Sequence, residues 1–254
     1  MSQSFNFKFK LAQTVIAVSY CLPTTKIICT DYLVSDREPS VAAISVTPGD
    51  IMQERAYLTE KKEGAPLEAS TPEALERLVL CRKSAELLPQ YGAVLFHGSA
   101  LAMDGEGILF TAASGTGKST HAALWRQVFG SRVVTINDDK PFLRADAAGF
   151  TVFGSPWRGK HRLGANTAAP VKAICVLHRG EENTIRRLTP REALPILMQQ
   201  TYRPRSLGAM LPTMQMTERL SREVPVYTLT CNMDPQAAWV AWRGINLDKE
   251  EEKS

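Results

Sequence analysis

The sequence predicts an α/β protein whose core is mostly β-sheet and which carries a loop of small residues between a strand and a helix. The apolar run at residues 108–112 leads into that loop, and an amphipathic helical pattern follows at residues 118–129. Other short apolar runs rich in β-forming residues, such as residues 133–137 and 171–179, alternate with helical patterns. The 254 residues, 44% of them hydrophobic and 22% charged, suffice for one large domain or two small ones.

The beginning of the chain predicts a β-rich segment. Turn-forming residues, Pro23, Pro39, Pro48 and Gly49, separate the apolar stretches of this region. We therefore expect short strands over residues 5–58, at 5–11, 17–21, 26–30 and 40–46. A charged connection at residues 59–69 ends this N-terminal segment, which we assign to residues 1–69.

A second domain is expected from residue 70 to residue 247. Ser70 and Glu73 form a potential capping box around Pro72, which predicts a helix that ends at Pro89. Two strands are expected before and into the small-residue loop, at residues 93–103, which include His97, and at 107–113, joined by a tight turn at 104–107. The later pattern predicts strands at 133–137, 171–179 and 224–231, a hairpin that turns at 147–149, and helices at 118–129, 190–202, 207–222 and 234–245. Residues 248–254 are expected to form a charged tail.

Composition excludes several classes of protein. The formal charge of +4, from 30 basic and 26 acidic residues, is too small to indicate nucleic-acid binding. The five cysteines are scattered and form no C-x-x-C pair, which predicts reduced thiols rather than a disulfide framework or a zinc site. No apolar run approaches the length of a membrane span, and the first residues lack a signal-peptide core. We expect a cytoplasmic protein without membrane partners, and we leave the oligomeric state open, a homo-oligomer included.

The loop itself follows the phosphate-binding pattern G-x-x-x-x-G-K-[ST], with Ala112 in place of the first glycine. In such a loop, successive backbone N–H groups converge on phosphate oxygens, and the following helix adds its positive end. Lys118 would reach the β- and γ-phosphates, and the Ser119 hydroxyl would bind magnesium. The sequence therefore predicts ATP, or another nucleotide or phosphate donor, together with Mg²⁺. The residues expected to bind it are Ser114, Gly115, Thr116, Gly117, Lys118, Ser119 and Thr120.

Two adjacent carboxylates, Asp138 and Asp139, end the apolar strand at residues 133–137. An acidic residue at this point can hold magnesium, and a second one can accept the proton of an attacking hydroxyl. The alternative interpretation is a strand end with solvated carboxylates, or a capping turn before Pro141. Their place after a buried strand favours the functional interpretation.

His97, the strand pair, the SGTGKST loop and the Asp138–Asp139 pair together resemble the HPr kinase/phosphorylase family over about residues 96–179. That family transfers a phosphoryl group from a nucleotide to a serine of a carrier protein. The loop also resembles that of the phosphoenolpyruvate carboxykinases, whose nucleotide-binding core shares this fold. The resemblance implies a nucleotide-binding core of the phosphoenolpyruvate carboxykinase/HPr kinase type with a P-loop. Residues 1–90 show no pattern of the carrier-protein kinases, and the chain is more similar to small kinase-like relatives found beside peptide-modification genes.

The resemblance assigns roles to individual residues. The interval from His97 to Lys118 equals the one between the family's catalytic histidine and its loop lysine. The second acid of the family's pair is its base for phosphorylation, which implies that role for Asp139. Asp138 and Ser119 would then face the metal.

A later stretch of the chain matches the family only in part. Arg158 and Gly159 match an Arg-Gly step, which implies that Arg158 stabilises the transferring group, a role that Lys160 in the same basic cluster could share. Where the family has a metal-binding glutamate, this chain has Trp157. This difference leaves a second metal contact and any phosphorylase activity open.

These observations predict a nucleotide- and magnesium-dependent phosphotransferase that acts on a hydroxyl, most simply a serine of a peptide or protein. One alternative acceptor is a small-molecule hydroxyl. A lyase of the carboxykinase type is a rival, but such enzymes are longer and use a Lys/His pair that is not clear in this chain. The other rival is a nucleotide-binding sensor without catalysis, and loss of phosphotransfer on Asp139→Asn substitution with nucleotide binding retained would discriminate against it.

Overall fold

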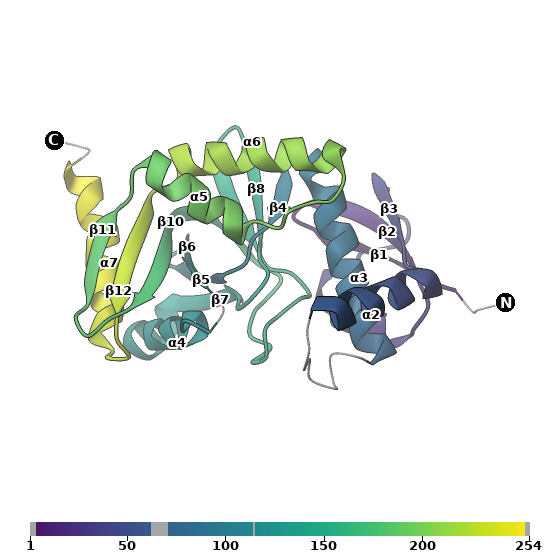
Figure 1. Cartoon of the computed structure of the whole chain (residues 1–254), viewed down its shortest axis with the longest axis horizontal. Coiled ribbons are helices and arrows are strands. Elements are labelled where there is room, and N and C mark those ends of the chain that lie inside the picture. The colour runs from purple at the N-terminus through teal and green to yellow at the C-terminus, as the bar shows by residue number, and fades with distance from the viewer. Residues whose placement is uncertain (1–3, 62–70, 114, 252–254) are drawn as a thin grey trace. The chain divides into compact units, whose positions relative to one another are not determined.

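The computed structural model of the chain describes residues 4–61, 71–113 and 115–251. It divides into two compact units, Met1–Tyr91 and Gly92–Ser254. The α/β class expected from the sequence is confirmed, with β-structure at the beginning of the chain and a larger mixed sheet in the second unit (Figure 1).

The first unit is built on a three-stranded sheet in the order β1-β2-β3. β1 and β2 pair antiparallel through a two-residue turn at Ala12 and Gln13, both of which have positive φ, and β3 runs parallel to β2. Alternate strand residues such as Phe9 and Ile16 are completely buried. The elements of this unit are β1 (Phe5–Leu11), β2 (Thr14–Tyr20), α1 (Thr24–Ile28), η1 (Thr30–Tyr32), β3 (Ala42–Ser45), α2 (Pro48–Lys61), α3 (Pro72–Leu87) and η3 (Leu88–Tyr91).

One stretch expected as a strand in the first unit is helical, because residues 26–30 fall in and between α1 and η1, so that expectation is wrong. The helix α2 lies in the segment expected to contain only short strands and was not predicted. The β-forming side chains at 27–30 follow Pro23, which starts the short helix α1, so local propensity yields to the turn chemistry before it. At α2, the side chain of Thr47 and the Asp50 carboxylate bond each other and each other's backbone N–H in the first turn, a helix start that the sequence pattern did not reveal.

The helix predicted after residue 70 is present as α3, but Thr71 rather than Ser70 is its N-cap and accepts a hydrogen bond from the N–H of Ala74 at 3.2 Å. α3 lies within the first compact unit, so the units divide at Tyr91 and Gly92, later in the chain than residue 70. The buried carboxylate of Glu76 explains why α3 belongs there. It accepts hydrogen bonds from the N–H groups of Cys21 (2.6 Å) and Leu22 (3.1 Å) and from the Thr25 hydroxyl.

The second unit contains a nine-stranded sheet among the described residues. Its order is β4-β8-β9-β10-β6-β5-β7, and β12 pairs with both β10 and β11. The long strand β10 pairs antiparallel with β9 through its first residues and parallel with β6 and β12 through the rest, which curls the sheet. The strands are β4 (Ala93–Leu95), β5 (Ser99–Met103), β6 (Glu106–Thr111), β7 (Val133–Asn137), β8 (Phe142–Asp146), β9 (Gly149–Phe153), β10 (Ala168–Arg179), β11 (Thr184–Arg187) and β12 (Val226–Cys231).

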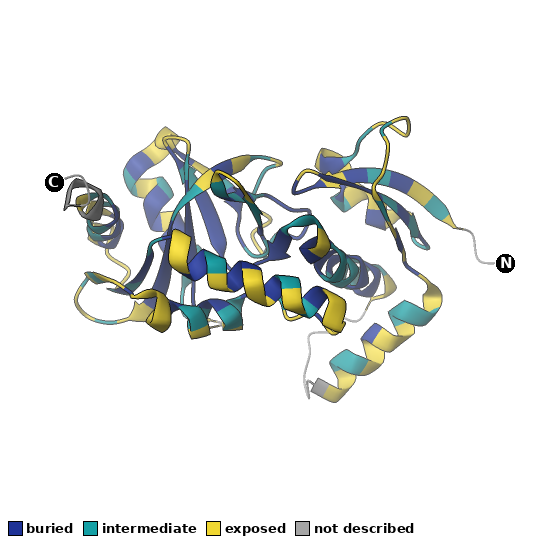
Figure 2. Ribbon diagram, turned by 90° about the horizontal axis from the view of Figure 1, so that it is seen from above, coloured by how far each residue is buried: buried dark blue, intermediate teal, exposed yellow. Residues whose placement is uncertain are grey.

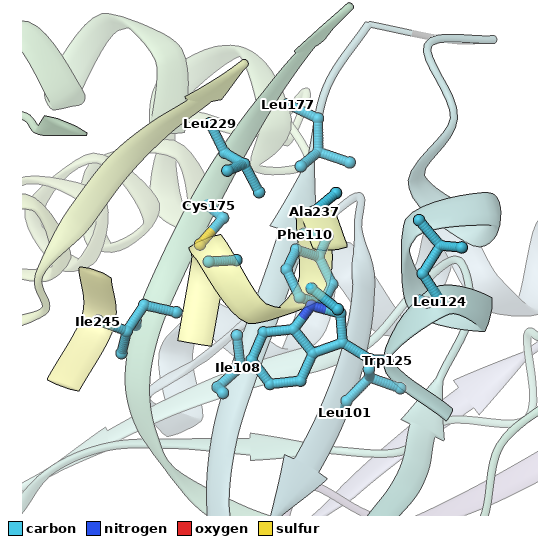
Figure 3. Packing of buried hydrophobic residues seen from close by; sticks show 14 of the residues in the cluster. Leu101, Ile108, Phe110, Leu124, Trp125, Cys175, Leu177, Leu229, Ala237 and Ile245 are labelled. Atoms are coloured by element: carbon cyan, nitrogen blue, oxygen red, sulfur yellow. The ribbon is translucent and has the colours of Figure 1, made fainter. Parts of the chain in front are cut away.

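Helices cover both faces of this sheet (Figures 1 and 2). Side chains of β10 alternate between two buried clusters. Cys175 and Leu177 join the cluster under α4 and α7, while Ile174 and Val176 join the cluster under α5 and α6. In the first cluster, Phe110 packs on Trp125 with ring centroids 5.4 Å apart (Figure 3). The helical elements are α4 (Lys118–Phe129), η4 (Gly130–Arg132), α5 (Pro190–Gln200), α6 (Leu207–Glu223) and α7 (Gln236–Glu251).

The strand directions bring four strand ends to one edge of the sheet. β6, β10 and β12 are mutually parallel, and β5 lies antiparallel between β6 and β7. β7 therefore runs in the same direction as β6. The loops that follow β6, β7, β10 and β12 consequently emerge at the same edge, which is where open α/β sheets bind ligands.

Other expectations have mixed outcomes. All five cysteines are free thiols, as predicted.

α7 continues through Glu251, so residues 248–251 are helical rather than part of a tail, and the remaining tail residues lie outside the described part of the chain. Within the described ranges, no helix is both long and apolar enough to cross a membrane.

Glu76 provides a test of the first unit. We expect Glu76→Ala to lower the free energy of unfolding by roughly 2–4 kcal/mol, because two backbone N–H groups and a hydroxyl lose their buried acceptor. Urea unfolding followed by circular dichroism measures the change. Glu73→Ala, in the first turn of the same helix, is the matched control and should change stability by less than about 1 kcal/mol. Equal effects of the two substitutions would contradict this role of Glu76.

Candidate functional site

The loop after β6 combines glycine conformations with an uncapped helix start. Gly115 and Gly117 have φ values of 80° and 122°, which disfavour any residue with a side chain. Gly117 is also the N-cap of α4, and no described side chain caps this end. The helical hydrogen bonds of α4 begin at His121, whose N–H donates to Gly117 O at 2.9 Å. The earlier N–H groups of α4 are therefore free of helical partners and can meet a ligand.

Two basic side chains hold the loop from either side. Lys118 Nζ donates to Ala112 O at 3.1 Å, across the width of the loop. Arg179, the last residue of β10, donates to Gly115 O at 2.6 Å and to Thr116 O at 3.2 Å. The carbonyls of Ala112, Gly115 and Thr116 are thus turned toward these cations.

The end of β7 is organised by the buried side-chain amide of Asn137. Its Oδ1 accepts the N–H groups of Asp139 (2.9 Å) and Lys140 (2.6 Å), while its Nδ2 donates to Ser155 O at 3.2 Å. This amide fixes the turn in which both carboxylates stand. The same amide joins the acids to the segment after β9 through Ser155.

The two carboxylates have different surroundings. Asp138 is 6% exposed and accepts the N–H groups of Gly159 (2.6 Å) and Leu163 (3.4 Å), so it ties down the 155–165 loop. A Cβ on Gly159 would lie 3.2 Å from Asp138 Oδ2, which explains a glycine there. Asp139, with a side chain 25% exposed, pairs with Lys140 and lies 3.7 Å from His97 Nε2. Asp139 is therefore the more accessible acid.

His97 does not lie in a strand, contrary to the sequence prediction. It lies between β4 and β5, where the chain passes from pairing with β8 to pairing with β6 and β7. The neighbouring Gly98 makes this passage possible, because a Cβ there would be 2.9 Å from Phe110 O. The Gly98 N–H donates to Asp139 O at 3.1 Å, so His97 is fixed beside Asp139.

Electrostatics couple the two sides of the site. Burial lowers the pKa of His97 below 6.5, the positive charge of Lys118 lowers it further, and Asp139 opposes both. Burial also lowers the pKa of Lys118, with Asp139 acting in the opposite direction. The loop lysine, the histidine and the exposed acid therefore interact in one electrostatic environment.

These groups share a pocket of about 950 Å³. One wall is the start of α4, and the facing wall is formed by the strand-end acids and the 155–165 loop. Of the site residues expected from the sequence, the pocket is lined by His97, Gly115, Gly117, Lys118, Ser119, Thr120, Asp138 and Asp139.

Two expected residues do not line this pocket, and a third, Ser114, lies outside the described residues. Thr116 lines two adjoining cavities instead. Arg158 does not line the pocket, and its Nε is buried 3.5 Å from the position that a Cβ on Gly164 would take. Trp157, at the position of the family's glutamate, is buried against Phe142, with 6.2 Å between the ring centroids.

The pocket also contains residues that the sequence did not single out. Arg126 follows Lys118 by eight residues on α4 and lines the same wall, a spacing of about two helical turns that could have identified it. His161 also lines the pocket, although the sequence gave no reason to choose it, and so does Lys160, which the sequence had named in the basic cluster. Positive charge therefore lies on both walls, from Arg126 on α4 and from Lys160 on the 155–165 loop.

The donor set is suited to an anion more than to a metal held by protein alone. Within residues 4–61, 71–113 and 115–251, no three His, Cys, Asp or Glu side chains gather closely enough to hold a metal ion. Ser119 and Asp138 line one pocket and are the oxygen donors there that suit Mg²⁺. Magnesium commonly binds through one or two protein oxygens and a substrate's phosphates, which fits these residues.

Comparisons with known proteins give a family and a structural likeness. Residues 73–236 match the model of a family described as SynChlorMet cassette protein ScmC. No curated protein matches the chain. Among solved structures, the Hpr(Ser) kinase/phosphatase from Coxiella burnetii is similar at 13% identity, with a TM-score of 0.40 over 63% of this chain and 94% of that one.

Titration of His97 tests the electrostatic description. We expect its pKa below 6.5, higher in Lys118→Met because a repelling cation is removed, and lower still in Asp139→Asn because an attracting anion is removed. Imidazole resonances followed by NMR against pH measure all three values. Shifts of the same sign in the two variants would contradict the geometry.

Proposed function

The chain belongs to the family described as SynChlorMet cassette protein ScmC, and we propose that it is a nucleotide- and magnesium-dependent kinase that phosphorylates a hydroxyl. The observation that carries this proposal is the single pocket that joins Lys118 and Ser119 at the start of α4 to Asp138 and Asp139 at the end of β7. Phosphoryl transfer needs a phosphate cradle facing a group that accepts a proton, and this pocket offers both.

The loop side would hold the donor's phosphates. Gly115 and Gly117 adopt conformations that disfavour a side chain, and the uncapped N–H groups at the start of α4 belong to residues that line the pocket, which suits an anion there. Lys118 would give up its hydrogen bond to the Ala112 carbonyl and bind phosphate oxygens, because a charged donor bonds an anionic oxygen more strongly than a neutral carbonyl. Arg126 and Lys160 add positive charge on the walls.

The acid side would hold the metal and receive the proton. Each oxygen of the Asp138 carboxylate retains a further lone pair beyond its bond to the 155–165 loop, so Asp138 and Ser119 can hold magnesium. When bound, magnesium supplies positive charge to the phosphate oxygens. Asp139 accepts the proton of the attacking hydroxyl. Its neighbour His97 lies 3.7 Å away, and burial and Lys118 lower its pKa, so at pH 7 the neutral imidazole does not pair with the carboxylate of Asp139 as a cation.

The acceptor we favour is a serine of a peptide or protein, with a small-molecule hydroxyl as the variant. The resemblance implied that Arg158 stabilises the phosphoryl group during transfer. We assign that role to Lys160 instead, because Lys160 lines the pocket and Arg158 does not. A sensor without catalysis is the second candidate. Asp139 opposes it, since nucleotide binding alone needs no accessible acid beside the phosphates.

Nucleotide binding is the first test. Calorimetry should show Mg²⁺-dependent binding of ATP or GTP in the micromolar range, weakened roughly ten- to a hundredfold in Lys118→Ala by loss of a charged hydrogen-bond donor. Arg191→Ala, an exposed cation on α5 outside the pocket, is the control and should bind like wild type. Failure of wild type to bind either nucleotide would overturn the proposal.

Catalysis is tested with radiolabelled ATP or GTP and a library of serine-containing peptides. We expect Asp139→Asn to lose phosphotransfer by a factor of roughly 10²–10⁴ while nucleotide affinity stays within a few-fold. Undiminished transfer by Asp139→Asn would remove this residue as the base. Binding without transfer by wild type to any peptide, or to glycerol as a small hydroxyl, would favour the sensor.

A further inference from the structure

A second cavity, of about 450 Å³, lies against the same loop. Its walls are the start of α4 and the segments that follow β10 and β12. We call it the α4–β12 pocket. Gly117 and Thr120 line both this cavity and the 950 Å³ pocket, so the two lie on either side of the helix start. A nucleotide whose phosphates lie on one side can extend its nucleoside to the other.

The lining of the α4–β12 pocket has the chemistry of a site for a flat aromatic ring. Leu124 and Leu177 belong to the buried cluster of Figure 3 and provide apolar walls, and Met233 is exposed at the rim. Arg179 contributes a planar guanidinium that the carbonyls of Gly115 and Thr116 hold in place. Ligand sites typically combine such apolar walls with a few fixed polar groups.

The fixed polar group is the imidazole of His121. Its side chain is 2% exposed, lines this pocket, and packs edge-on to Phe110 with 4.7 Å between the ring centroids. Trp125 Nε1 donates to His121 Nε2 at 3.1 Å. Because an indole N–H can only donate, Nε2 must carry the lone pair, and the proton of the neutral ring lies on Nδ1.

That proton has no acceptor among the described residues, because His121 Nδ1 is buried without a hydrogen-bond partner. Burial also lowers the pKa of His121 to about 4, so the ring is neutral at pH 7 and this tautomer is the one present. A buried N–H donor without an acceptor costs about 1–3 kcal/mol, which a ligand acceptor would recover. A residue that lines this apolar pocket thus carries an N–H donor without an acceptor among the described residues.

A third cavity, of about 590 Å³, lies on the other side of the loop beside Gln199 and Gln200. Gln200 Oε1 is also buried without a partner among the described residues. Its residue is only half-buried, however, and a glutamine amide can rotate to exchange donor for acceptor. This cavity shares only Gly115 with the 950 Å³ pocket, whereas the α4–β12 pocket shares the helix start itself. The geometry therefore favours the α4–β12 pocket.

We propose that the α4–β12 pocket binds the base of the donor nucleotide, with His121 Nδ1–H donating to an acceptor atom of that base. The inference rests on the proposed function, since it needs nucleotide phosphates at the start of α4. It adds a site that recognises the nucleoside and gives the buried histidine a role separate from catalysis.

Comparison of ATP and GTP with inorganic tripolyphosphate separates the base from the phosphates. In calorimetry with Mg²⁺, His121→Phe should lower the affinity for the preferred nucleotide on the order of tenfold and leave the affinity for tripolyphosphate unchanged. Gln199→Ala is the control from the third cavity and should bind both ligands like wild type. Failure of wild type to bind any of the three would instead overturn the proposed function.

A second measurement needs no substitution, because His121→Phe leaves the buried Trp125 indole without its acceptor and could unfold. In ¹⁵N-labelled wild type, the Nδ1 resonance of His121 should shift when ATP or GTP is added and stay in place with tripolyphosphate. Equal shifts with both ligands, or nucleotide affinity unchanged in a folded His121→Phe, would overturn the base site. Loss of nucleotide affinity in Gln199→Ala alone would place the base in the third cavity.

Discussion

The antiparallel position of β5 between β6 and β7 is the constraint on which the site depends. It makes β7 run in the same direction as β6, so the small-residue loop and the Asp138–Asp139 turn leave the sheet at one edge. β10 and β12, parallel to β6, add their ends to that edge. Because the strands are held by backbone pairing and covered by helices on both faces, the distance between the loop and the acids is set by the core rather than by mobile segments.

Polar groups then orient what the sheet has brought together. The side-chain amide of Asn137 fixes the turn that contains Asp138 and Asp139, and the carboxylate of Asp138 accepts a backbone hydrogen bond from the 155–165 loop. Asp139 is left as the accessible acid, with Lys118 and His97 close enough to influence one another's protonation. Two adjacent residues of the same type thus acquire different roles from their partners, as is common where acid–base chemistry is done.

Much of this organisation follows from the sequence, because the strand–loop–helix pattern and the paired acids are local signals. The same is true of the hairpin at residues 142–153 and of the later helices. Residues 26–30 were misassigned because Pro23 starts a helix there against their β propensity. The place of His97 depends on distant contacts, since it lies where a chain segment changes sheet partners, and only the structure shows that Arg126 lines the pocket and Arg158 does not. The tautomer of His121 is set by the hydrogen bond from Trp125, which follows it by one helical turn. The sequence shows this spacing but does not show that both rings are buried and bonded to each other.

The central claim is that the edge where β6 and β7 end holds the phosphates of a nucleotide. Hydrogen–deuterium exchange of the backbone amides, with and without a saturating Mg²⁺ complex of ATP or GTP, tests it directly. The account predicts slower exchange at residues 115–120 and at 137–140 together, because one ligand contacts the helix start and braces the facing turn. Binding that saturates while these two segments exchange unchanged, with protection elsewhere in the chain, would contradict it.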